Sequence, residues 1–95
     1  MNTCNFVGKL ISKELTKDND GVDVLFFDLE VQSEIKGKKR LDILTFELWS
    51  TSAIAFSKYS NIGDIIVIES TARRDKETEE VYFRVKNFKI LVGED

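Results

Sequence analysis

The chain has 95 residues, of which 42% are hydrophobic and 33% charged, a balance typical of one globular domain spanning residues 1–95. Seventeen acidic residues outnumber fourteen basic ones, and the resulting net charge of −3 excludes the overall basic surface of a typical duplex-DNA binder. With no histidine and a single cysteine, Cys4, the chain has no standard zinc site, no intrachain disulfide and no usual proton shuttle. We therefore expect no enzymatic activity, no metal and no cofactor.

Nothing at the start of the sequence indicates export. Residues 1–3 lack a basic segment followed by a long apolar run, so they do not form a secretory signal. No apolar stretch approaches the ~20 residues that a membrane-spanning helix needs. We expect an intracellular protein that does not associate with a membrane.

The first half of the sequence has the two-residue alternation of β-strands. Strands are expected over three segments, residues 4–15, 22–33 and 41–49. Gly8, within the first of them, indicates a bulge or a sharp bend. Residues 17–21, which read Lys-Asp-Asn-Asp-Gly, form a strong turn signal, and the next break falls at residues 36–40.

The periodicity then changes to that of a short helix over residues 50–60. Ser and Thr at its start are favourable N-cap residues. Ala53, Phe56 and Tyr59 recur at positions i, i+3 and i+6, and we expect them to plug one end of a barrel. Gly63 is placed to end the helix.

Two further strands are expected over residues 65–73 and 81–91, on either side of a charged loop over residues 74–80. The resulting order is three strands, a helix and two strands. This is the order of the all-β OB-fold, a five-stranded, partly open Greek-key barrel, here with one short helix between its third and fourth strands. Another small five-stranded barrel with a short helix would fit the pattern nearly as well.

Four segments, taken in order, resemble the bacterial and organellar single-stranded DNA-binding protein (SSB) family. They are Phe6-Val7-Gly8-Lys9-Leu10; Phe27-x-Leu29-x-Val31; Leu48-Trp49-x-x-x-Ala53 through Lys58-Tyr59-x-x-x-Gly63-Asp64 to Val67-x-Glu69; and Val85-x-x-Phe88-x-Ile90-Leu91. No single segment is specific, but the ordered set covers nearly the whole chain. The resemblance implies an OB-fold and, less directly, binding of single-stranded DNA.

The sequence also departs from the family pattern. The family usually carries an aromatic residue six positions before Trp49, where this chain has Ile43, and the loops at residues 34–39 and 75–79 lack stacking aromatics. The chain also stops at residue 95, without the long acidic tail by which bacterial members recruit replication and repair proteins. Short relatives include the primosomal replication protein N and plastid or cyanobacterial proteins. The resemblance thus implies a short, tail-less member in a bacterial cytoplasm or a plastid.

Trp49 is the best candidate for stacking on a base. Sequence-tolerant binding of single strands combines aromatic faces, which stack on bases, with cations along the phosphate path. Trp49 lies on the polar-leaning face of the third strand, opposite the apolar face formed by Leu44, Phe46 and Leu48. A purely structural Trp would be expected on the apolar face. The alternative is that Trp49 covers the barrel rim or a subunit contact.

The candidates for contacting phosphates fall in three groups: Lys36, Lys38, Lys39 and Arg40 at a hairpin tip; Arg73 and Arg74 beside the charged loop; and Arg84 and Lys86, which share a face of the last strand with Tyr82. Each group also has a simpler interpretation. The tip could be a solvated hairpin that protects a sheet edge, and the last group an ordinary polar outer face. For the middle group, solvated charge is the better interpretation, because neighbouring acids dilute it.

The leading hypothesis is a sequence-nonspecific single-stranded DNA-binding protein in DNA replication, repair or recombination. It would associate with itself, as a dimer or a tetramer, and with replication proteins. The alternative is an OB-fold module for protein–protein interaction, or an accessory subunit of a replication complex, with weak affinity for nucleic acid. The missing aromatics and the acidic balance favour this alternative.

Overall fold

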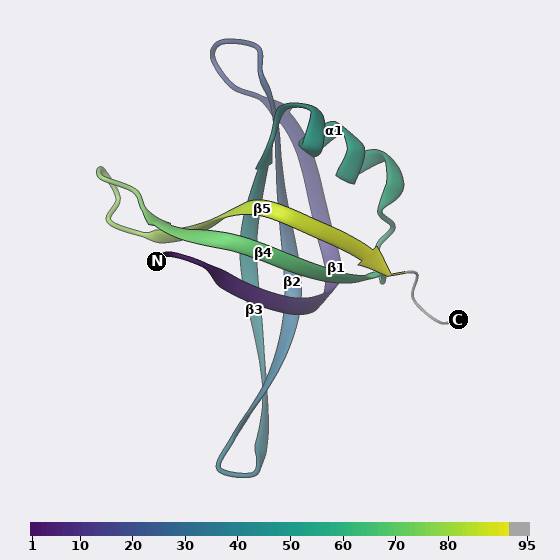
Figure 1. Ribbon diagram of the computed structural model, residues 1–95, viewed down its shortest axis with the longest axis vertical. Helices are drawn as coiled ribbons and strands as arrows, with labels where there is room; N and C mark the ends of the chain where they lie inside the picture. The colour runs from purple at the N-terminus through teal and green to yellow at the C-terminus, as the bar shows by residue number, and fades with distance from the viewer. Residues whose placement is uncertain (92–95) are drawn as a thin grey trace.

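The computed structural model describes residues 1–91. The expectation that the chain has no acidic tail concerns residues 92–95, which lie outside the described residues. The elements are β1 (Cys4–Lys17), β2 (Asp23–Ile35), β3 (Lys38–Trp49), α1 (Ser50–Tyr59), β4 (Ile65–Arg74) and β5 (Val81–Leu91). The strands form a closed barrel in the order β1-β2-β3-β5-β4 (Figure 1). The prediction of an all-β, five-stranded barrel with a short helix between the third and fourth strands is confirmed.

The barrel closes at a narrow seam, whereas a partly open barrel was expected. β3 and β5 run parallel and pair at two positions, Phe46 with Phe83 and Glu47 with Arg84. The other neighbouring strands pair antiparallel and over longer stretches. The seam therefore makes the outer faces of β3 and β5 continuous, although α1 and β4 lie between these strands in the sequence.

β1 bends, so its two halves pair with different strands. Its residues 4–9 pair with β4, and residues 9–17 pair with β2. The bulge that accompanies the bend lies at Ile11, three residues beyond Gly8. Gly8 instead serves the close crossing of the strands: a Cβ atom there would lie 2.9 Å from the carbonyl oxygen of Glu30, so glycine alone fits without a shift of the backbone.

The β2–β3 hairpin extends beyond the barrel at the end opposite α1 (Figure 1). Its turn consists of Lys36 and Gly37, whose φ values of 53° and 77° are those of a two-residue type I′ turn. The break expected over residues 36–40 is therefore shorter than predicted. Lys38, Lys39 and Arg40 already belong to β3 and pair with the end of β2.

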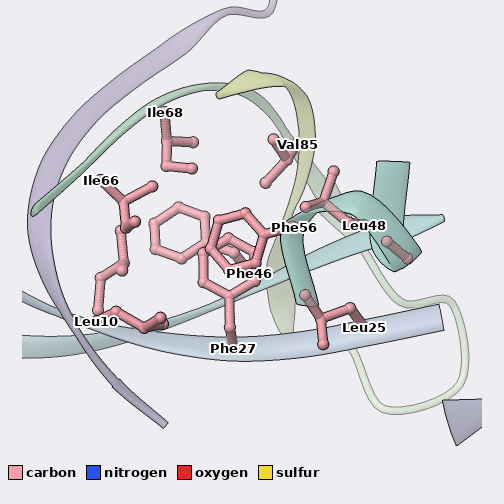
Figure 2. Close-up of a cluster of buried hydrophobic side chains, with 11 residues drawn as sticks. Leu10, Leu25, Phe27, Phe46, Leu48, Phe56, Ile66, Ile68 and Val85 are labelled. Atoms are coloured by element: carbon pink, nitrogen blue, oxygen red, sulfur yellow. The ribbon is translucent and has the colours of Figure 1, made fainter. Parts of the chain in front are cut away.

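The hydrophobic core fills the inside of the barrel (Figure 2). It consists of Leu10, Leu25, Phe27, Leu29, Phe46, Leu48, Ala53, Phe56, Ile66, Ile68 and Val85. The ring of Phe27 stacks on that of Phe56, with centroids 4.4 Å apart, and on that of Phe46, with centroids 5.4 Å apart. Phe56 thus anchors α1 across one end of the barrel, as the helical spacing predicted.

The prediction that Tyr59 belongs to this plug is wrong. Tyr59 is 65% exposed, and Ser60 is buried in its place. In an α-helix, Ser60 falls within about 20° of Ala53 around the axis, whereas Tyr59 falls about 120° away. The hydroxyl of Ser60 donates to the carbonyl of Phe56, and the ammonium of Lys13 donates to the carbonyl of Ser60. These bonds satisfy the C-terminal end of α1.

Candidate nucleic-acid interface

A groove follows the seam on the outer face of the barrel. It is lined by residues of β2, β3, β5 and the loop after β4: Phe26, Ile43, Leu44, Thr45, Glu47, Trp49, Asp75, Thr78, Glu80, Val81, Tyr82, Phe83 and Arg84. Seven of these thirteen residues are apolar or aromatic, and six are polar or charged. Such a mixed lining lets a ligand pack on apolar faces while polar contacts orient it.

Trp49 is fixed where β3 passes into α1. It occupies the N-cap position with extended backbone angles, φ −122° and ψ 151°, so its side chain continues the outward alternation of β3. The expectation that a Ser or Thr caps the helix is wrong, since no side chain caps it and Ser50 is already its first residue. The indole is half-buried and lies outside the buried cluster that fills the barrel. It is thus available to a ligand in the groove.

Three side chains at the seam form one network. One carboxylate oxygen of Glu47 (Oε1) accepts the indole N–H of Trp49 at 3.1 Å and the Nε–H of Arg84 at 2.8 Å. The guanidinium carbon of Arg84 lies 5.1 Å from the centroid of the indole, within the range of a cation–π contact. We call Glu47, Trp49 and Arg84 the seam cluster.

Glu47 is the functional residue that sequence reasoning missed. Only 8% of it is exposed, although it lies on the face of β3 that the alternation assigns to the outside. The sequence places it two residues before Trp49, but its ion pair with Arg84 depends on the parallel pairing of β3 with β5. No sequence signal indicates that pairing.

A second polar cluster continues the outer face toward β1. The carboxylate of Asp28 accepts the hydroxyl of Ser12 at 2.8 Å and that of Thr45 at 2.6 Å. Both oxygens of this carboxylate are therefore engaged. Within this part of the outer face, the polar groups mainly satisfy each other and do not point freely into the groove.

The loop over residues 75–80 forms an acidic wall of the groove. The Asp75 carboxylate accepts the backbone N–H of Glu77 at 2.8 Å and that of Thr78 at 3.0 Å. These hydrogen bonds, that from Thr78 first, hold the pKa of Asp75 below its usual value of 3.8. Asp75 is therefore ionised at neutral pH, and with Glu80 it makes this wall unfavourable to phosphate.

The groove brings together only part of the predicted site. Trp49, Tyr82 and Arg84 line it. Arg73 and Arg74 line an adjacent hollow that also includes Tyr82. Like Arg84, two further predicted cations have acidic partners instead of free charges: Arg74 pairs with Glu79 at 3.3 Å, and Lys86, outside the groove, pairs with Glu69 at 3.8 Å.

The remaining predicted cations lie at the end of the β2–β3 hairpin, away from the groove. Arg40 pairs with Asp42 at 3.1 Å. Within residues 1–91, Lys36, Lys38 and Lys39 form no ion pair, and we call these three the lysine tip. Lys39 shares a face of β3 with Trp49, because their positions differ by ten, an even number.

On the face of β3 that carries Lys39, the next two residues are apolar and exposed. Leu41 is 60% exposed and Ile43, at the position where the SSB family usually has an aromatic residue, is 63% exposed. Along one outer face of β3, a cation is thus followed by two apolar side chains, then by Thr45 and Glu47, and finally by the indole. Alternation along β3 could have identified this order, since all these residues have odd numbers.

Other kinds of site were searched for over residues 1–91. Within this range, no three His, Cys, Asp or Glu side chains gather in a way that could hold a metal ion. The helix of this range is also too short to cross a bilayer.

No protein-family model matches the chain, and no curated protein matches it in sequence. Its structure is similar to that of the protein PriB from Ralstonia solanacearum, with a TM-score of 0.76 and 9% identity over 95% of this chain and 97% of the other. It is similar to the mitochondrial single-stranded DNA binding protein Rim1 from S. cerevisiae, with a TM-score of 0.80 and 14% identity over 99% and 97% of the two chains. It is also similar to the SSB domain of a Synechococcus sp. protein, with a TM-score of 0.72 and 19% identity over 93% of each chain.

These similarities establish the fold. The chain shares the fold of these structures, a five-stranded barrel of the OB-fold type, here with the helix between β3 and β4. At 9–19% identity they do not by themselves transfer a function, because one fold can carry many functions.

Proposed function

We propose that the protein binds single-stranded DNA, with little overall sequence preference, and acts in DNA replication, repair or recombination. The observation that carries this proposal is the position of Trp49, half-buried in an outer groove and not in the core. An indole in such a place stacks on an unpaired base, a contact worth about 1–3 kcal/mol. Arg84 beside it supplies a cation for the adjacent phosphate.

The lysine tip supports the proposal from a second direction. Its three ammonium groups have no acidic partner within residues 1–91, so they are available to a polyanion. Each phosphate that a lysine neutralises releases counterions and strengthens binding at low salt. Two of the structural neighbours are a mitochondrial single-stranded DNA binding protein and an SSB domain, which is in keeping with this role.

The proposal includes self-association and an intracellular location, in a bacterial cytoplasm or a plastid, without an enzymatic activity. Self-association is supported by a hollow on the outer face of β1, β4 and β5, where the paired residues Val7 and Val67 are 58% and 36% exposed. Adjacent exposed valines on a sheet favour contact with a partner surface. Sedimentation equilibrium of the full chain would give the mass, and a monomer at all concentrations would contradict this part of the proposal.

The test of DNA binding uses the only tryptophan of the chain as its own probe. An oligonucleotide of about 20 nucleotides and mixed sequence is longer than the ~4–16 nucleotides that one OB-fold covers. We expect this oligonucleotide to quench Trp49 emission at low salt. At high salt the complex should dissociate and the emission should recover. Anisotropy of a labelled oligonucleotide should show roughly 10-fold or greater loss of affinity in Trp49→Ala. Tyr59→Ala, on the exposed side of α1, is the matched aromatic control and should bind as the wild type does.

A protein–protein module is the second candidate, and the acidic wall of the groove favours it. Asp75 and Glu80 line the groove, and the one cation of the groove, Arg84, is paired with Glu47. These acidic groups would attract a basic, apolar peptide. Absence of quenching and of anisotropy change at low salt would reject DNA binding and leave this second function.

A further inference from the structure

The seam cluster has a consequence for which bases the groove accepts. We propose that Glu47 makes the groove select bases that carry an exocyclic amino group, cytosine, adenine and guanine, and disfavour thymine, at the position that stacks on Trp49. This inference rests on the proposed function, because it concerns the same groove. It follows from what a base must replace when it enters.

The first step is the exchange of Arg84 for the base. Trp49 and Arg84 both line the groove, and the guanidinium covers the indole with 5.1 Å between its carbon and the ring centroid. A base that stacks on the indole from the groove therefore takes the place of the guanidinium. Arg84 is 38% exposed in its side chain, so it can turn toward the phosphate of the incoming nucleotide.

The second step is the loss that this exchange causes at Glu47. The carboxylate accepts a hydrogen bond of 2.8 Å from Arg84, and the side chain of Glu47 is only 11% exposed. When Arg84 leaves, Oε1 keeps only the indole N–H of Trp49 as its donor within the cluster. A buried acceptor that loses its charged partner is costly, so a ligand that supplies a new donor binds more tightly than one that does not.

The third step is the position of the carboxylate relative to the base. The indole N–H lies in the plane of its ring and donates to Glu47 at 3.1 Å, so the carboxylate lies at the edge of the ring. A base stacked on the indole presents its own edge to the same carboxylate. Amino groups on cytosine, adenine and guanine donate to a carboxylate, as in the pairing of Glu with cytosine N4. Thymine has a single ring N–H, and a carbonyl oxygen lies on each side of it. These oxygens repel the Glu47 carboxylate.

Other acids near the groove do not have this role. Asp28 already accepts two hydroxyl groups, one on each oxygen. Glu80 lines the same groove but is exposed, so water satisfies its carboxylate whichever base is present. Glu80 is therefore the matched control: it has the same charge and lies in the same groove, but it makes no bond to the seam cluster.

The experiment compares oligo-dC with oligo-dT at neutral pH and one salt concentration. The two pyrimidines have similar stacking areas and differ mainly in the amino and carbonyl groups on the edge. We expect the wild type to bind oligo-dC about 10-fold more tightly, the factor that one charge-assisted hydrogen bond supplies. In Glu47→Gln, the amide oxygen still accepts from Trp49 while the amide N–H donates to thymine, so the ratio should fall to about one or reverse. Glu80→Gln should raise both affinities alike and keep the ratio.

Equal affinities of the wild type for the two oligomers, or a ratio that Glu47→Gln leaves unchanged, would overturn the inference while DNA binding itself stands. Absence of binding to both oligomers would overturn the proposed function and the inference together. NMR on the wild type provides a test that needs no variant. The nuclear Overhauser contacts between the Arg84 side chain and the Trp49 indole should be lost on saturation with oligo-dC, and contacts that persist in the saturated complex would contradict the exchange step.

Discussion

The seam cluster lies at the end of β3 and the lysine tip at its start, and the two regions hold their charges in opposite ways. At the seam, Arg84 is bonded to Glu47 and lies over Trp49, and the acid is almost fully buried. At the tip, Lys36, Lys38 and Lys39 are exposed and form no ion pair within residues 1–91. The stacking site is thus structured before any ligand arrives, whereas the tip is held only by its backbone pairing.

This difference separates two contributions to binding. Free surface cations attract a polyanion over a distance of about one Debye length, and salt weakens their effect. A cation that is already paired contributes only when a ligand offers it a better partner than its present one. We therefore expect the tip to control salt dependence and the rate of encounter, and the seam cluster to control which base is held and how firmly.

The largest expected effect is on stability, in Arg84→Ala. The substitution leaves the buried Glu47 carboxylate with the indole N–H as its remaining donor in the cluster. We expect the free energy of unfolding to fall by about 1–3 kcal/mol, the cost of an under-satisfied buried acceptor and less than that of a fully buried ion pair. Urea denaturation monitored by Trp49 emission would measure it.

The double variant Arg84→Ala with Glu47→Gln tests the cause of that loss. Neutralising the acid should restore part of the stability, since no charge is then left buried. Arg74→Ala is the control, because its pair with Glu79 is 65% and 73% exposed and should contribute less than about 1 kcal/mol. Equal stability of Arg84→Ala and the wild type would show that the seam is held by its strands alone.

A smaller effect, on affinity alone, is expected when all three residues of the lysine tip are changed to Gln. Stability should stay within about 0.5 kcal/mol, because the three side chains are exposed and unpaired. If each contacts a phosphate, the slope of log affinity against log salt should become shallower by about 2, at roughly 0.7 per contact. A titration of the labelled oligonucleotide over a range of salt concentrations would measure the slope.

The control for the lysine tip is Lys58→Gln on α1, which removes a positive charge at the end of the barrel opposite the β2–β3 hairpin tip (Figure 1). It should leave the slope as it is in the wild type. A slope equally unaffected by the triple change would remove the tip from the DNA path and leave it the role of a solvated hairpin that protects a sheet edge.

The sequence predicts the tip and the seam unequally well. Alternation of apolar residues located the strands and placed Trp49 outside the core, because a strand buried on one face must alternate. It could not place Arg84 beside Glu47, since these residues are 37 positions apart and meet only through two parallel pairs of β3 with β5. The sequence pattern also placed the lysines in a loop. A cluster of charges around a glycine indicates a break between strands, but it does not tell a turn of two residues from one of five.

The smallest expected effect concerns Asp75, in the loop that forms the acidic wall beside the seam cluster. Its pKa lies below 3.8 because its carboxylate accepts backbone N–H groups of Thr78 and Glu77. Protonation therefore occurs at lower pH in the folded chain than in the unfolded one, so these bonds contribute fully above about pH 3.8 and are lost as the pH falls through the lowered pKa. We expect the amide resonances of Glu77 and Thr78 to shift in that acidic range while the indole N–H of Trp49 does not follow the same step. Asp75→Asn should abolish the step, because its amide oxygen still accepts but no longer titrates. A midpoint at or above 3.8 would mean that the loop is not held by this carboxylate, and the acidic wall would then be free to move away from an approaching strand.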